Sequence, residues 1–156
     1  MTARVDTVSR RVAASPDAVF AAFSEPGAMA RWLPPNDMTG EMLRFDFREG
    51  GSYRMRLTYA ERHRGRGKTS ADADEVTVRI TKLVPGRLLE QEVAFDSEEA
   101  SFAGRMRMTW SMERDGDGTL VTVRAEDVPA GIRPEDHVAA MTASLAQLAG
   151  FVEAAG

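Results

Sequence analysis

The residues from Phe102 to Met112 alternate between apolar and polar side chains, and a long amphipathic segment, Pro134 to Glu153, follows near the end of the chain. Met106, Met108 and Trp110 alternate with arginine and threonine, as in a strand with one apolar face. The later segment repeats apolar residues at helical spacing. A helix of this kind needs an apolar surface to cover. The two segments together therefore predict a curved sheet that holds one long helix, with room for a ligand between them.

The rest of the chain predicts six more strands and two short helices, and so an α+β fold. The first strand is Val5 to Val12, and Ser15 followed by Pro16 is typical of a helix start. That helix is expected to reach Phe23, and a second one carries Met29 and Trp32. The other strands are predicted from alternating residues: Leu43, Phe45 and Phe47; Tyr53, Met55, Leu57 and Tyr59; Val76, Val78 and Ile80; Leu89, Gln91, Val93 and Phe95; and Leu120 to Ala125. Short turns such as Pro85-Gly86 join them, which favours an antiparallel sheet.

The chain of 156 residues is expected to form one domain, residues 1–156. It has no cysteine, which excludes disulfides and thiolate chemistry. No apolar run approaches the roughly 20 residues of a membrane span, and the N-terminus has no apolar core of a secretory signal. We therefore expect a cytoplasmic protein. The net charge of −4 gives no attraction to nucleic acid.

A charged stretch from Glu61 to Glu75 interrupts the predicted strands. Arg62, Arg64, Arg66 and Lys68 alternate in part with glycine, and acidic residues follow at once. We interpret this stretch as a solvated hairpin connection whose charges compensate each other. A phosphate-binding role is the alternative.

Two polar residues, His137 and Ser144, fall within the apolar arc of the final helix. The arc is formed by Val138, Met141, Leu145, Leu148, Phe151 and Val152. His137 is expected either as a partly exposed residue of the first turn or as an imidazole at the mouth of the cavity. The helix N-terminus and apolar surroundings would favour its neutral form, and we expect Asp136, which points about 100° away around the helix, not to oppose this. Ser144 either bonds to its own helix or faces the cavity.

The remaining candidate ligand-binding residues are aromatic, methionine, leucine and glutamine side chains on the predicted inner faces. Each can line a cavity, and each can equally belong to ordinary core. They are Trp32, Tyr53, Met55, Leu57, Tyr59, Gln91, Met106, Met108, Trp110, Met141 and Leu145. The sequence contains no glycine-rich phosphate loop and no nucleophile elbow. Its two histidines, His63 and His137, do not form a metal motif, so we expect neither a metal nor a cofactor.

Several short motifs, in order, resemble the SRPBCC superfamily (START-like, Bet v 1-like), and within it the branch named after the activator of heat-shock protein 90 ATPase. They are Ala14-Ser15-Pro16, Trp32-Leu33 before Pro35, Gly50-Gly51 before Tyr53-Arg54, Thr109-Trp110, and Gly131-Ile132 before Pro134-Glu135-Asp136-His137. The resemblance covers nearly the whole chain. It implies a helix-grip fold, in which an antiparallel sheet wraps the C-terminal helix around a cavity.

Three functions are compatible with these observations. The first is the binding of a small, mostly apolar molecule between sheet and helix, without a cofactor. The second is a cyclase- or hydrolase-type enzyme acting on an aromatic or polyketide-like substrate, with His137 as the acid or base. The third is a co-chaperone or regulatory protein that acts through an outer surface. The oligomeric state is open, with a homodimer as one option.

Overall fold

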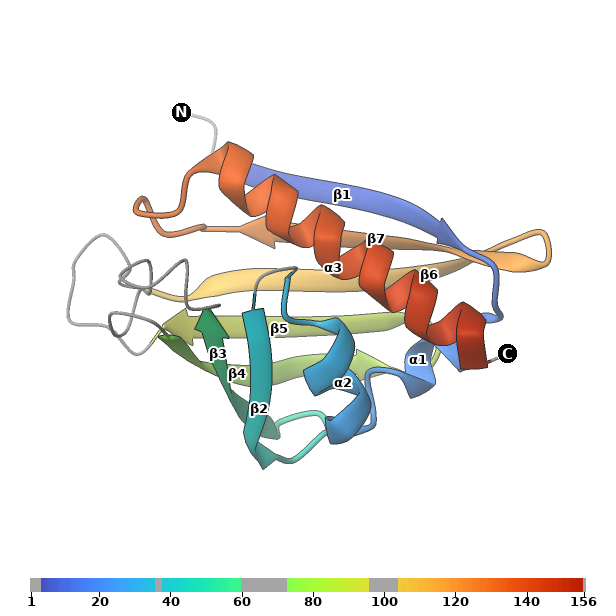
Figure 1. Ribbon diagram of the computed structural model, residues 1–156, viewed down its shortest axis with the longest axis horizontal. Coiled ribbons are helices and arrows are strands. Elements are labelled where there is room, and N and C mark those ends of the chain that lie inside the picture. Colours follow the sequence, from blue (N-terminus) through green and yellow to red (C-terminus); the bar gives the residue numbers. More distant parts are fainter. Residues whose placement is uncertain (1–3, 36–37, 60–72, 96–103, 156) are drawn as a thin grey trace.

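The computed structural model describes residues 4–35, 38–59, 73–95 and 104–155 (Figure 1). Strand β1 (Val5–Val12) is followed by two short helices, α1 (Pro16–Ala21) and α2 (Pro26–Trp32). Six strands come next, and the long helix α3 (Pro134–Ala155) ends the fold. The six strands are β2 (Met38–Phe45), β3 (Ser52–Tyr59), β4 (Ala73–Val84), β5 (Leu88–Phe95), β6 (Met106–Asp115) and β7 (Gly118–Glu126). The predicted α+β order is confirmed.

The strands form one antiparallel sheet in the order β1-β7-β6-β5-β4-β3-β2. Each strand from β2 to β7 pairs with its neighbour in sequence, and β1 closes the series by pairing with β7. Helix α3 crosses the sheet from the start of β1 towards α1 (Figure 1). It is tied to the β1 segment near both ends, by His137 to Asp6 and by Glu153 to the backbone N–H of Ala13.

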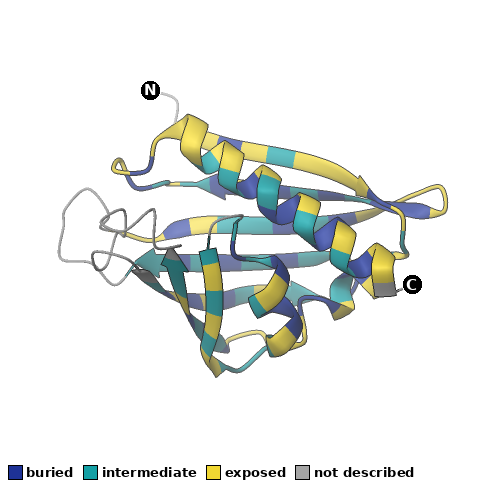
Figure 2. Ribbon diagram, in the orientation of Figure 1, coloured by how far each residue is buried: buried dark blue, intermediate teal, exposed yellow. Residues whose placement is uncertain are grey.

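The two faces of the sheet differ in character, as the period-two pattern predicts. The inner face, under the helices, carries the buried core, with Ile80, Leu89 and Val123 fully covered (Figure 2). The outer face carries ion pairs across neighbouring strands, for example Arg54 with Glu75 at 2.9 Å and Arg105 with Glu92 at 3.2 Å. A site for an apolar ligand is therefore expected on the inner face or at its margins.

Two details of the sequence interpretation are wrong. Leu43 was assigned to the same face as Phe45, but it is 41% exposed, because the pairing of β2 with β3 shifts register between Met42 and Arg44. The extra residue of this bulge turns Leu43 outward and leaves Met42 opposite Met55. Val138, assigned to the apolar arc of α3, is 38% exposed.

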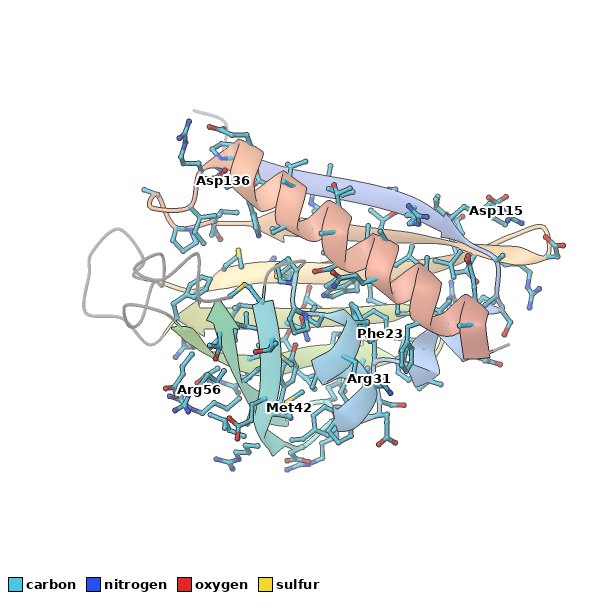
Figure 3. The ribbon with its side chains drawn as sticks, in the orientation of Figure 1. Phe23, Arg31, Met42, Arg56, Asp115 and Asp136 are labelled. Atoms are coloured by element: carbon cyan, nitrogen blue, oxygen red, sulfur yellow. The ribbon has the colours of Figure 1, made fainter. Side chains whose placement is uncertain are left out.

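The end of the inner face nearest α1 and α2 is closed by aromatic rings. Phe23, which is labelled in Figure 3, lies 4.8 Å from Trp32 and 5.3 Å from Trp110, centroid to centroid, in edge-to-face arrangements. Trp32 and Trp110 also meet edge to face at 5.6 Å. All three side chains are at most 3% exposed. This group, the aromatic end, is packed core.

Candidate ligand-binding site

The opposite end of the inner face is less well covered, and we call it the Met108 end. It lies at the end of β3 and β5 and the start of β6, where Leu57, Phe95 and Met108 pack on the core and yet are only half-buried. Their strand neighbours Met55 and Val93, nearer the aromatic end, are buried. Phe45 and Leu83, elsewhere on the inner face, are also half-buried, so the Met108 end is one of several places in the described residues where apolar inner-face side chains stay accessible.

Strand register connects the Met108 end to two polar groups. Met108 lies opposite Gln91 of β5 on one side and opposite Ala125 of β7 on the other. Ala125 in turn lies opposite Asp6 of β1. One row across the inner face therefore runs Asp6, Ala125, Met108, Gln91, and it places a carboxylate and an amide on either side of the methionine.

Gln91 joins two aromatic residues in a buried hydrogen-bonded chain. The indole N–H of Trp110 donates to Gln91 Oε1 at 3.3 Å, and Gln91 Nε2 donates to the hydroxyl of Tyr53 at 3.1 Å. The three residues are between 2% and 3% exposed. Burial raises the pKa of Tyr53 to about 12, although the hydrogen bond from Gln91 acts in the opposite direction. Tyr53 therefore stays a neutral phenol over the physiological range.

His137 contacts a carboxylate that the sequence interpretation did not consider. Its Nδ1 lies 2.8 Å from Asp6 Oδ2, and Arg4 binds the same carboxylate at 2.8 Å. Burial alone would raise the pKa of Asp6, but the hydrogen bonds and charges of Arg4 and His137 outweigh it and lower that pKa. Asp136 is exposed at the first turn of α3, as Figure 3 shows. The carboxylate that contacts the ring is therefore that of Asp6 in β1, and not that of Asp136.

Two other candidates use their polar atoms inside the fold. The Ser144 hydroxyl donates to the carbonyl of Leu33 at 2.6 Å, rather than to its own helix. Gln147, one turn later, donates to the carbonyls of Trp32 and Pro34. Trp32 donates its indole N–H to the carbonyl of Ala22 at 2.9 Å. These bonds fasten α3 to the end of α2 and leave none of these groups pointing into a cavity.

The predicted residues thus fall into three groups. Leu57, Met108 and His137 are half-buried at or near the Met108 end. The side chain of Tyr59, like the stretch Arg64 to Lys68, lies outside the described residues. The other nine are buried: Trp32, Tyr53, Met55, Gln91, Met106, Trp110, Met141, Ser144 and Leu145. Which of them touch a ligand stays a prediction.

Sequence reasoning missed Asp6 and Gln147. The signal for Asp6 was present, because it shares its face of β1 with Val8 and Val12 and is therefore a charged residue on an inward position. Gln147 carried no comparable signal, since an amide on a helix is ordinary at the surface. Its role depends on where α2 ends, which the sequence does not reveal.

Two kinds of site were sought in the described residues, besides the inner face. Among them, no cluster of three or more histidine or acidic side chains is placed to hold a metal ion. None of their helices combines the length and apolar character needed to span a bilayer. A shallow pocket of about 410 Å³ does lie by the β4–β5 turn, between Lys82, Arg87 and Glu113. Its mixed charges do not define a ligand.

A seven-stranded antiparallel sheet, two short helices after the first strand and a long C-terminal helix packed on the sheet define the helix-grip class of α+β proteins. Such folds typically have a ligand-binding cavity. Residues 13–153 match the family model described as Activator of Hsp90 ATPase homolog 1-like protein. The chain belongs to this family, as its motifs indicated. No curated protein matches the sequence.

Solved structures agree with this assignment. A crystal structure of a protein from Chromobacterium violaceum is 30% identical, with a TM-score of 0.84 over 96% of each chain. A crystal structure from Rhodobacter sphaeroides has 18% identity and a TM-score of 0.80, covering 99% of this chain and 95% of its own. The solution structure of the AHSA1-like protein from Aeromonas hydrophila has 18% identity and a TM-score of 0.74, covering 98% and 94%. The last two show the fold alone.

Proposed function

We propose that the protein binds a small, mostly apolar molecule between the sheet and α3, entering at the Met108 end. The observation that carries the proposal is the half-burial of three neighbouring apolar side chains, Leu57, Phe95 and Met108, at one end of the face that carries the core. Accessible apolar surface on the concave side of a fold is typical of ligand sites. The flexible thioether of Met108 suits a ligand of loosely specified shape.

Titration with an environment-sensitive apolar dye, and with a fatty acid that displaces it, tests the proposal. We expect saturable binding with one site per chain. Met108→Arg places a charge on the inner face and should abolish binding, because burial of an unpaired charge is costly. Thr109→Arg is the matched control, since the next residue of β6 faces the outer side and should leave binding intact. Failure of any apolar ligand to bind the folded wild-type protein contradicts the proposal.

A second candidate function is acid-base catalysis by His137, and it is favoured by the contact with Asp6. A carboxylate bonded to Nδ1 fixes the orientation of an imidazole and supports a positive charge on it, as a general base requires. Hydrolysis of a panel of activated aryl esters tests this function. We expect a rate with an inflection near neutral pH that is lost in His137→Gln. A rate that is unchanged in this variant removes the enzyme candidate and leaves the binding proposal untouched.

A further inference from the structure

The orientation of the Gln91 side chain is determined by its neighbour Trp110. An indole nitrogen is a donor only, so the atom of Gln91 that it faces at 3.3 Å must be the amide oxygen. The amide nitrogen therefore faces Tyr53. This assignment follows from hydrogen-bond chemistry alone and needs no view of the hydrogen atoms.

The amide orientation decides what the Tyr53 hydroxyl can do. Because Gln91 Nε2 donates to it at 3.1 Å, the phenolic oxygen accepts, and its own hydrogen must be given elsewhere. Among the hydrogen bonds of residues 4–35, 38–59, 73–95 and 104–155, none uses this hydrogen. A hydroxyl that is 3% exposed and cannot donate costs about 1–3 kcal/mol. The hydroxyl of Tyr53 is therefore a buried donor whose hydrogen has no acceptor among the described residues.

The surroundings limit what the acceptor can be. Val78 lies opposite Tyr53 on β4, and the ring of Phe45 lies 6.1 Å from the Tyr53 ring. The arginines of the same strand, Arg54 and Arg56, lie on the outer face and pair with Glu75. A carboxylate brought to Tyr53 would thus be desolvated with no arginine of β3 on its side of the sheet, which is unfavourable. A neutral oxygen in an otherwise apolar molecule can accept the hydrogen of Tyr53 and carries no charge to desolvate.

We propose that the ligand carries a neutral oxygen acceptor, such as a ketone or ester carbonyl, and that the Tyr53 hydroxyl donates its hydrogen to this oxygen. The inference rests on the proposed function and adds to it the chemical class of the ligand. Trp110 and Gln91 act as positioning residues, because they direct the phenolic hydrogen without touching the ligand oxygen. The hydrogen-bonded series from Trp110 through Gln91 to Tyr53 then ends at the ligand oxygen.

The test compares acetylnaphthalene with isopropenylnaphthalene, in which a CH₂ group replaces the carbonyl oxygen. We expect the wild-type protein to bind the ketone about two- to tenfold more tightly, which is the usual net value of one neutral hydrogen bond. The infrared carbonyl stretch of the bound ketone should also shift to the lower frequency of a hydrogen-bonded carbonyl. In Tyr53→Phe the preference and the shift should both disappear. Thr122→Val, which removes an exposed hydroxyl of the outer face, should keep both.

Trp110→Phe gives a second and less obvious outcome. Without the indole donor the Gln91 amide is free to turn and accept from Tyr53, so the ketone preference should fall even though Tyr53 is intact. Should this variant not fold, as judged by circular dichroism, the wild-type spectrum and Tyr53→Phe still decide the question. Equal binding of the two probes with an unshifted carbonyl overturns the inference and leaves the proposed function standing. Absence of ketone binding also overturns it, and the dye and fatty-acid titration then decides the proposed function separately.

Discussion

Asp6 is the residue whose position departs most from what its chemistry would suggest. It is a carboxylate that is 5% exposed on the inner face of β1, and it is held there by Arg4 and His137. Arg4 also donates to the carbonyl of Ile132 at 2.6 Å, just before α3 begins. These contacts join the first strand to the start of the last helix. The charge is tolerated because its partners are in place.

The lowered pKa of Asp6 makes stability depend on acidic pH. Because the folded pKa lies below the ordinary 3.8, the unfolded chain binds the proton more readily, and the stabilisation is complete above that value and lost as the pH falls through the folded pKa. We expect Asp6→Asn to lose stability at neutral pH and to show a flatter decline on acidification. Urea denaturation between about pH 6 and pH 2 measures both. Parallel pH curves for the two proteins would contradict this account.

Tyr53 produces the opposite dependence at alkaline pH. Its folded pKa of about 12 exceeds the ordinary 10.0, so its contribution is complete below pH 10 and is lost as the pH rises through 12. Tyr53→Phe should therefore gain stability relative to the wild type above about pH 10. Near-ultraviolet absorbance should show one tyrosine that ionises late in the wild type and is missing from this variant. Tyr59→Phe is the control, and it should keep the late transition.

Single residues show how far sequence reasoning reaches. Gln91 was correctly predicted to point inward, because strand alternation depends only on its neighbours along the chain. The surroundings of His137 could not be predicted in the same way. Asp136 is its neighbour in sequence, whereas the partner in space is Asp6, 131 residues away. A pKa depends on such non-local contacts, and no periodicity encodes them.

Among the elements, α2 and α3 illustrate how two helices are joined by side chains rather than by apolar contact alone. The last carbonyls of a helix have no partners within it. Here Gln147 of α3 donates to the carbonyls of Trp32 and Pro34, and Ser144 donates to that of Leu33. The end of α2 is thereby satisfied by α3. These bonds also hold Trp32 in position within the aromatic end.

Removal of the Ser144 hydroxyl tests this junction. Ser144→Ala deprives the Leu33 carbonyl of its side-chain donor in a buried position, and we expect a loss of about 1–3 kcal/mol. Thr142→Ala is the matched control, because its hydroxyl donates at 2.7 Å to Val138 within its own exposed turn of α3 and should matter little. Thermal or urea denaturation compares the two variants. Similar losses of stability in the two variants would mean that the hydrogen bond from Ser144 to Leu33 contributes no more than the exposed bond of Thr142.

Element order was predictable, whereas element edges and faces were less so. Alternation and turn residues predicted all seven strands, because both are local properties. The bulge that turns Leu43 outward depends on how β2 pairs with β3, which local pattern does not determine. Val138 satisfies the helical period and is still 38% exposed, although His137 beside it contacts Asp6 of the sheet.

At the scale of the whole fold, the described residues form a closed aromatic end and a less covered Met108 end, and α3 spans both. The resemblance predicted a cavity between sheet and helix but could not locate it. The aromatic end, with Phe23, Trp32 and Trp110, leaves no room for a ligand. Toward the start of α3, the sheet presents Met108 and Leu57, which are half-buried. A ligand site is therefore expected under the first half of the helix, and the second half serves stability.

The difference between the two ends predicts that truncation of a buried side chain costs more stability at the aromatic end than near the Met108 end. Met29 of α2 is 1% exposed near the aromatic end, and Met29→Ala should cost about 2–5 kcal/mol, as in close-packed cores. Met141 lies one turn after His137 and is 4% exposed. If the proposed cavity lies beside it, Met141→Ala should cost clearly less, because a side chain at a cavity wall loses fewer contacts. Met141→Ala should also change the affinity for the apolar dye, whereas Met29→Ala should not. Urea denaturation and dye titration of both variants measure these effects. Equal losses of stability at the full core value would show that the fold is packed along the whole of α3, and the cavity would then have to lie elsewhere.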